Sequence, residues 1–119
     1  MKTWVLRIRA KNRIIFSQIK SGRKKVETRA PGFTKTGKNF SHVKKGDTLL
    51  FICGKARLRK KVKKVQRFRT VEVFFKKVNQ KLVWPHLKER TLENIKKQYY
   101  IYPGYKERIK KYGLVAFWI

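Results

Sequence analysis

The sequence predicts a small α+β domain built around a strongly bent sheet or an open β-barrel, with short flanking helices. Its patterns follow the order strand, helix, several strands, several helices and a final strand, which is typical of this fold class. The length of 119 residues fits one domain, spanning residues 1–119, and leaves little room for a second. Hydrophobic residues make up 41% of the chain and aromatic residues 13%, enough to build a core despite a formal net charge of +28.

The N-terminal part of the chain predicts a strand and a short helix. Residues 3–9 alternate, with large apolar side chains on one face, as expected of a strand. Asn12 is placed to cap a helix, and Gly22 is placed to end it, because glycine is favoured just past a helix C-terminus. Residues 24–29 then indicate an extended segment, which leads into a polar loop over roughly 30–46.

The middle of the chain predicts strands, one of them strongly basic. Residues 48–53 form a continuous apolar run of strand length, which predicts a strand buried on both faces.

In the segment 55–69, nine of fifteen residues are basic and none is acidic. As a strand, this segment would have a cationic face formed by Arg57, Arg59, Lys61 and Lys63. Its apolar face would be formed by Ala56, Leu58 and Val62. The apolar pattern slips at Val65, which predicts a bulge or bend near that residue.

The C-terminal part of the chain predicts helices and a last strand. Thr70 can cap a helix that carries apolar residues at i, i+3, i+4 and i+7. Thr91 can cap a second helix, which is broken at 103–104 by a proline and a glycine. Further helical turns would end at Gly113, and residues 114–119 form an apolar strand.

Several classes of protein are disfavoured by the composition. The single cysteine, Cys53, excludes an intramolecular disulfide, and the sequence shows no secretory signal pattern. No run approaches the roughly 18 apolar residues of a membrane span. A cytoplasmic protein without a membrane span is therefore expected. The two histidines, His42 and His86, lie far apart without paired cysteines, so no metal ion and no other cofactor is expected. No pattern specifies an oligomeric state.

The excess of positive charge predicts the class of partner. The chain has 34 basic residues against six acidic ones. A polyanion would relieve the resulting self-repulsion, and Lys and Arg side chains neutralise phosphates. RNA or another nucleic acid is therefore the expected partner, with the basic face of 55–69 on the phosphates. An anionic membrane surface is the weaker alternative.

Aromatic side chains in basic, loop-like surroundings are candidates for stacking on bases. These candidates are Phe33, Trp84, Tyr99, Tyr100 and Tyr102. The competing expectation for each aromatic residue is a place in the hydrophobic core, which fits Tyr99 better than the other four.

Four landmarks in order along the chain resemble the ASCH domain family. Gly22, Lys24, Glu27 and Arg29 are spaced as in the G-x-K-x-x-E-x-R signature of that family. The three later landmarks that resemble the family are 44–51, with its K-x-G-D pattern, 68–75, and the C-terminal end formed by 102–105 and 112–117. ASCH domains are small β-barrels similar to PUA domains. The resemblance therefore implies an open PUA-like barrel with an RNA-related role, in which a cleft around Lys24, Glu27 and Arg29 receives a base or nucleotide.

The resemblance also implies an enzymatic alternative. Some ASCH proteins hydrolyse N4-acetylcytidine and some are ribonucleases, so a small metal-independent hydrolase with Lys24 and Glu27 as catalytic residues is the second hypothesis. In the amidohydrolase members, the lysine activates a threonine three residues later, and a later glutamate assists. Here Glu27 stands at the threonine position, Thr28 is expected to face away, and the later acid would be Glu89 or Glu93.

A simpler interpretation of the signature residues competes with both hypotheses. Glu27, flanked by Lys25 and Arg29, would form an exposed ion pair of little energetic value. In a regular strand Lys24 and Glu27 would point to opposite faces, so they converge only if Lys24 still lies in the turn after Gly22.

Overall fold

The structure is a computed structural model that describes residues 1–32 and 39–119; Phe33, a stacking candidate, lies outside the described residues. Within the described part, the strands form two three-stranded sheets. The first sheet has the order β1 (Thr3–Arg7), β3 (Thr48–Cys53) and β4 (Ala56–Lys61). The second sheet has the order β2 (Val26–Arg29), β6 (Leu114–Trp118) and β5 (Lys64–Phe68).

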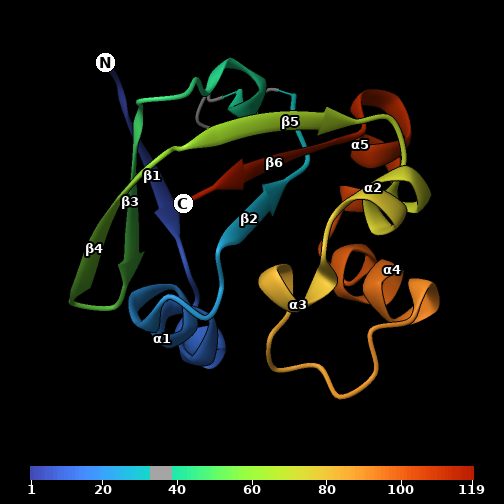
Figure 1. Ribbon diagram of the computed structural model, residues 1–119, viewed down its shortest axis with the longest axis horizontal. Coiled ribbons are helices and arrows are strands. Elements are labelled where there is room, and N and C mark those ends of the chain that lie inside the picture. The colour runs from blue at the N-terminus through green and yellow to red at the C-terminus, as the bar shows by residue number, and fades with distance from the viewer. Residues whose placement is uncertain (33–38) are drawn as a thin grey trace.

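The two sheets are open and differ in their pairing. In the first sheet β1 is parallel to β3, whereas β4 is antiparallel to β3. In the second sheet β2 and β5 are both antiparallel to the central strand β6. Figure 1 shows β1, β3 and β4 on one side of the molecule and the helices α2 to α5 on the other, with β2 and β6 between them. The predicted α+β class with short helices is confirmed, and the strands form two small open sheets.

The helices are short, and most of their ends follow the expected signals. They are α1 (Arg13–Ser21), α2 (Val71–Lys77), α3 (Gln80–Val83), α4 (Leu92–Tyr100) and α5 (Tyr105–Tyr112), with 3-10 turns η1 (Ala10–Asn12) and η2 (Phe40–His42). The hydroxyls of Thr70 and Thr91 accept the backbone N–H groups of Val73 and Asn94, as predicted for N-caps. Among the described residues, no helix is long and apolar enough to cross a membrane.

Two details of the helices differ from the expectation. Asn12 occupies the N-cap position of α1, but its side chain makes no capping hydrogen bond, because α1 continues directly from the 3-10 turn η1. The helix α3 has only four residues and was not predicted, since one turn is too short to produce a periodic pattern. Gly22 ends α1 with a left-handed φ of 82°, as expected of a glycine at this position.

The basic segment 55–69 is divided between the two sheets. Strand pairing stops at Lys61 and resumes at Lys64, so the bend expected near Val65 lies at residues 62–63. The bend is fixed from outside the segment: Gly46 N donates to Val62 O, and Lys63 N donates to Trp118 O. Lys63 lies after the end of β4, but it is exposed and keeps the alternation with the buried Val62. Ala56, expected on the apolar face, is exposed at the start of β4.

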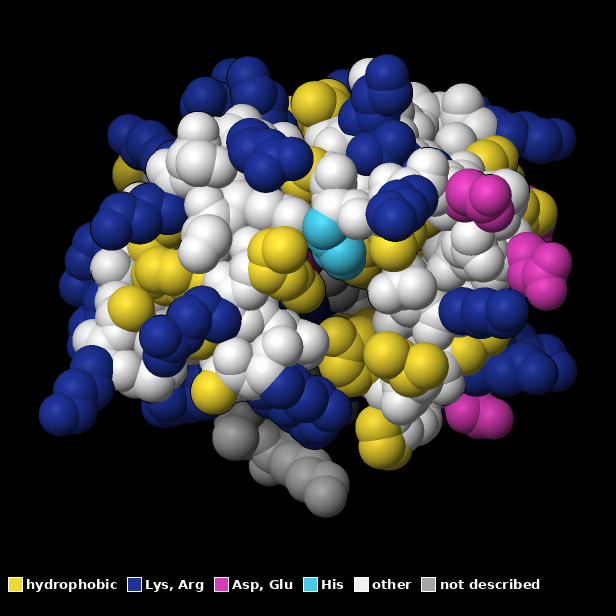
Figure 2. Space-filling view, turned by 90° about the horizontal axis from the view of Figure 1, so that it is seen from below, with side chains coloured by type: hydrophobic (Ala, Val, Ile, Leu, Met, Phe, Trp, Pro, Cys, Tyr) yellow, Lys and Arg dark blue, Asp and Glu magenta, His cyan; other side chains and the backbone are white. Residues whose placement is uncertain are grey.

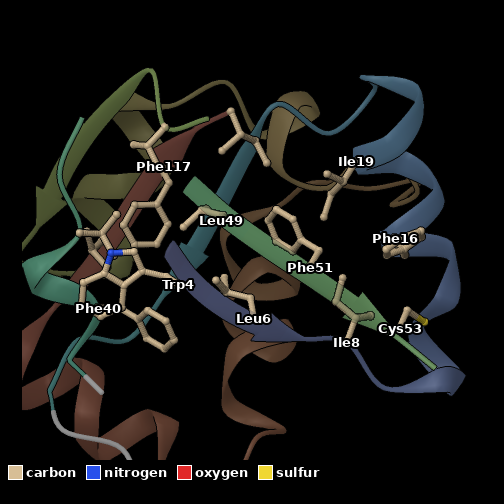
Figure 3. Packing of buried hydrophobic residues seen from close by; sticks show 14 residues of the cluster. Trp4, Leu6, Ile8, Phe16, Ile19, Phe40, Leu49, Phe51, Cys53 and Phe117 are labelled. Atoms are coloured by element: carbon tan, nitrogen blue, oxygen red, sulfur yellow. The ribbon is translucent and has the colours of Figure 1, made fainter. Parts of the chain in front are cut away.

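Two hydrophobic clusters share the central strand β6. One cluster packs β1, β3 and α1 against Val115 and Phe117 of β6, and Figure 3 shows Trp4, Leu6, Leu49 and Phe51 with Phe117 in it. The other cluster packs the helical side against Leu114 and Ala116. Alternate side chains of β6 thus point into opposite clusters, so this one strand contributes to both. In β3, by contrast, Leu50 is only half-buried, so burial on both faces was overpredicted for that strand.

Candidate functional site

A cavity of about 260 Å³ lies where the first sheet, β2 and the helical side meet. Its walls come from the end of β1, the start of α1, strand β2, the segment after α3, the end of α4 and the start of α5. Figure 2, which views the molecule from below Figure 1, shows a hollow near the centre of this face with hydrophobic side chains around it. Three signature residues line the cavity: Lys24, Glu27 and Arg29.

Lys24 reaches the cavity because it precedes β2. After the left-handed Gly22, the backbone N–H of Lys24 donates to Gln18 O at 3.0 Å, which folds the chain back along α1. Strand β2 begins only at Val26. Because Lys24 lies outside the strand, its side chain need not point to the face opposite that of Glu27. Its Nζ lies 3.9 Å from Glu27 Oε1. Lys24 thus lies in the turn after Gly22, which is the position in which its side chain and that of Glu27 were expected to converge.

The Lys24 ammonium is enclosed by protein. Its exposed fraction is 3%, its Nζ donates to Val83 O at 2.6 Å, and it lies 5.1 Å from the centre of the Trp84 ring. Burial lowers the pKa of Lys24; the nearby Glu27 carboxylate partly opposes this change and Arg29 adds to it. A buried lysine of lowered pKa beside a carboxylate is a chemically distinctive group.

Glu27 is also buried, with an exposed fraction of 7%. Its Oε1 accepts the backbone N–H of Thr28 at 2.8 Å, and its Oε2 lies 3.8 Å from Arg29 Nη2. The carboxylate is thus held between two cations inside the molecule. The simpler interpretation of an exposed ion pair is wrong, because the turn after Gly22 brings Lys24 over the carboxylate and the helical side covers both.

Aromatic side chains form much of the remaining wall. Thr28 Oγ1 and Tyr99 Oη lie 2.6 Å apart, and burial raises the pKa of Tyr99. Both residues line the cavity, so the expectation that Thr28 faces away from it is wrong. The Trp84 ring lies 5.3 Å from that of Tyr99, and the rings of Tyr102 and Tyr105 are 5.4 Å apart. Tyr99 is therefore both a core residue and a wall of the cavity.

Two buried donors at this site have no hydrogen-bond acceptor among the described residues. They are Arg29 Nε and Trp84 Nε1. Both residues line the cavity, and the Arg29 side chain is 22% exposed. Buried polar groups in proteins generally form hydrogen bonds. These two donors do not form one with any described residue, so they remain available to a ligand in the cavity.

The other predicted site residues lie away from the cavity. Arg57, Arg59 and Lys61 are exposed on β4, Lys63 is exposed at the bend, and Tyr100 is exposed on α4 near Lys106. Glu89 and Glu93 do not line the cavity; both are exposed, and Glu93 pairs with Lys97 at 3.9 Å. Neither is therefore placed to be the later acid of an amidohydrolase. His86 packs beside Trp84, with Nδ1 3.3 Å from Gln18 Oε1.

Six residues that line the cavity were not predicted as site residues: the polar Arg7, Arg9, Asn12 and Tyr105, and the apolar Ile8 and Ile15. The alternation of residues 3–9 already separates Arg7 and Arg9 from the apolar face of β1, and this was the available signal. This alternation cannot predict that the end of β1 lies beside β2, because that depends on how the two sheets are arranged.

Charge is distributed unevenly over the fold. Residues 1–69 hold 23 of the 34 basic residues but only two of the six acidic ones, Glu27 and Asp47. Both are buried, and Asp47 accepts hydrogen bonds from Lys2 N, Trp4 Nε1 and Lys44 N. The other four acidic residues lie in 72–107, and Figure 2 shows acidic side chains gathered at the helical side. The described surface of residues 1–69 therefore carries charged groups of positive sign only.

The fold and the site define a small α+β domain with a cationic strand surface and a cavity that holds the buried Lys24 and Glu27 beside the partly exposed Arg29. The chain is similar over 98% of its length to 95% of the crystal structure of the hypothetical protein PH0355, with 27% sequence identity and a TM-score of 0.73. It is also similar over 97% of its length to 93% of the solution NMR structure of protein PF0455 from Pyrococcus furiosus, with 26% identity and a TM-score of 0.66. No protein-family model and no curated protein matches the chain.

Proposed function

We propose that this protein is an RNA-binding domain of the ASCH, PUA-like type. Exposed Lys and Arg side chains bind the phosphates, and the cavity around Lys24, Glu27 and Arg29 receives a base or nucleotide. The observation that carries the proposal is the burial of both acidic residues of 1–69, because it leaves a wholly cationic surface next to a polar cavity. The G-x-K-x-x-E-x-R spacing, which resembles the ASCH signature, adds to it.

The phosphate contacts are assigned first to β4. Arg57, Arg59 and Lys61 are exposed on an edge strand, and within the described residues none of them forms an ion pair. Each can therefore neutralise a phosphate without first losing a carboxylate partner. Lys63 extends the cationic surface around the bend.

The base contacts are assigned to the cavity. Trp84, Tyr102 and Tyr105 offer aromatic surface, and base stacking on such side chains contributes about 1–3 kcal/mol per base. Arg7 and Arg9 are exposed and also line the cavity, where they can hold the phosphates of the nucleotide that enters. Tyr100, exposed near Lys106, is a further stacking candidate outside the cavity.

The test is a titration of fluorescently labelled single-stranded RNA with the purified protein, followed by anisotropy at several salt concentrations. We expect binding at low salt and a linear fall of log K with log salt, because phosphate binding releases counterions from the RNA. An absence of binding at low salt would overturn the proposal. Equal affinity for single-stranded DNA of the same sequence would overturn only its preference for RNA.

A hydrolase that acts on N4-acetylcytidine or RNA is the second candidate, and one observation favours it. Lys24 Nζ and Glu27 Oε1 lie 3.9 Å apart in the cavity, and the lowered pKa of Lys24 suits an acid–base group. Incubation of the protein with N4-acetylcytidine and with labelled single-stranded RNA tests this candidate. Turnover that Lys24→Ala abolishes, with binding retained, would place the hydrolase first; no turnover of either substrate would leave a binding domain.

A further inference from the structure

The polar groups of the signature cluster form an ordered row. Lys24 Nζ lies next to Glu27 Oε1 and Arg29 Nη2 lies next to Glu27 Oε2, so the row reads donor, acceptor, acceptor, donor. The separations of 3.9 Å and 3.8 Å are ion-pair distances and too long for hydrogen bonds. The groups therefore attract one another electrostatically without using up their hydrogen-bonding capacity.

The capacity that remains can be counted. A lysine ammonium has three donors, and only one is used here, on Val83 O. A carboxylate has about four acceptor positions, and the hydrogen bond that Glu27 receives from a described residue is the one from Thr28 N. The cluster can therefore bind a ligand edge that presents an acceptor, two adjacent donors and a second acceptor.

Of the four common bases, guanine has this edge. N3, the N2 amino group, N1–H and O6 of guanine read acceptor, donor, donor, acceptor. Cytosine and adenine each present one amino donor next to ring acceptors, and uracil presents one N–H donor between two carbonyl acceptors. An ionised carboxylate can only accept, so it fits the two adjacent donors of guanine, while a cation fits O6.

The cavity suits one base, and its chemistry disfavours a phosphate at the cluster. Its volume of about 260 Å³ is just below the ~300–1,000 Å³ typical of pockets for drug-sized ligands, so it holds a single base-sized group. The Glu27 carboxylate would repel a phosphate placed against it. The exposed Arg7 and Arg9 at the cavity provide cations for the phosphates instead.

Resting on the proposed function and extending it, we infer that this cavity selects guanine, with Glu27 accepting from N1–H and N2 and a flanking cation donating to O6. Burial strengthens the selection, because a base that lacks the matching donors would leave the remaining acceptor positions of the enclosed carboxylate unsatisfied. Glu27 is thus the specificity-determining residue, and the surface of β4 contributes affinity without base selection.

The experiment compares short single-stranded RNAs that are identical except for one central position, which holds G, inosine, A, C or U. Inosine lacks the N2 amino group of guanine but keeps N1–H and O6. We expect the G-containing RNA to bind about tenfold or more tightly than the inosine RNA, because one hydrogen bond to a charged group is lost. Equal affinity for G and inosine, or tighter binding of U, overturns the inference.

Protein variants locate the selection. Glu27→Gln replaces one acceptor oxygen with a donor and should abolish the preference for G over inosine while the salt-dependent binding persists. Glu93→Gln removes an exposed carboxylate outside the cavity and should leave the preference unchanged. If Glu27→Gln does not fold, the comparison of G with inosine on the unaltered protein still decides. Equal binding of all five RNAs overturns guanine selection alone, whereas no binding of any overturns the proposed function as well.

Discussion

The ammonium of Lys24 lies 3.9 Å from the carboxylate of Glu27, and both side chains are almost entirely buried. Arg29 lies 3.8 Å from the other carboxylate oxygen, so one anion is shared by two cations in a place of low dielectric. Transfer of such charges from water carries a desolvation cost that their mutual attraction and hydrogen bonds must offset. The stability of this region therefore depends on which charge is removed.

Glu27→Leu should destabilise the protein more than Lys24→Met does. Loss of the carboxylate leaves Lys24 and Arg29 facing each other without a counter-charge, which we expect to lower the free energy of unfolding by about 3–5 kcal/mol. Loss of the ammonium still leaves Glu27 with Arg29 and the Thr28 N–H. Urea unfolding of both variants and of the double variant measures their free energies of unfolding and shows which substitution destabilises the protein more. A Glu27→Leu variant as stable as Lys24→Met would contradict the shared-anion arrangement.

Lys24 should also make stability depend on alkaline pH. Burial lowers the pKa of Lys24 from its ordinary value of 10.5, so between the lowered pKa and 10.5 the unfolded state binds more protons than the folded state. The free energy of unfolding therefore rises with pH in that window, and this rise is absent from Lys24→Met. The raised pKa of Tyr99 has the opposite effect, but it is present in both proteins and cancels in their difference.

The measurement for Lys24 is the free energy of unfolding of wild type and Lys24→Met in urea, from about pH 7 to about pH 10. The free energy of unfolding of the wild type minus that of Lys24→Met should increase as the pH increases. A difference that is constant over this range would mean that Lys24 titrates at its ordinary pKa in the folded protein.

Gly113 joins α5 to β6, and its replacement by alanine should be strongly destabilising. Its φ is +77°, and a Cβ there would lie 2.2 Å from the backbone oxygen of Phe68 at the end of β5. Gly104 offers a comparison in the left-handed region, with φ +78° and ψ −6°, where a Cβ would meet no atom within 4 Å. Gly113, with ψ −154°, lies instead in a region that essentially only glycine adopts. We expect Gly104→Ala to cost about 1–2 kcal/mol for its backbone conformation alone. Gly113→Ala should cost clearly more in the same unfolding assay, because both its backbone conformation and the contact with Phe68 oppose a side chain. Equal costs would contradict this expectation.

Local patterns predicted much of the fold, because they act within a few residues. Thr70 and Thr91 cap helices whose apolar faces repeat at helical spacing, and Gly22 ends α1 in the left-handed conformation that glycine favours. The bend in the basic segment could not be located in this way. It is fixed by hydrogen bonds from Gly46 and to Trp118, which are distant in sequence, so the slip of the apolar pattern located the bend only approximately.

The candidate site was predicted as a cluster only where its residues lie close together along the chain, whereas Trp84, Tyr99 and Tyr102 were predicted separately as stacking candidates. Lys24, Glu27 and Arg29 follow one another around the start of β2, and their spacing carries the resemblance to the ASCH signature. Arg7 and Tyr105 reach the same cavity from β1 and α5, and no short pattern relates such distant segments. The sequence also could not show that the ion pairs are buried, because burial depends on the helical side that covers β2.

The cationic face of β4 should determine how steeply RNA binding depends on salt. In a variant with Arg57→Gln, Arg59→Gln and Lys61→Gln, each lost phosphate contact should reduce the slope of log K against log salt by about 0.7. A control variant removes three exposed lysines from the helical side by Lys76→Gln, Lys77→Gln and Lys81→Gln. Both variants lose the same net charge, so anisotropy titrations separate the position of the charge from its amount. Equal slopes in the two variants would contradict a phosphate-binding surface on β4, whereas a reduced slope confined to the β4 variant would assign the phosphate contacts to it.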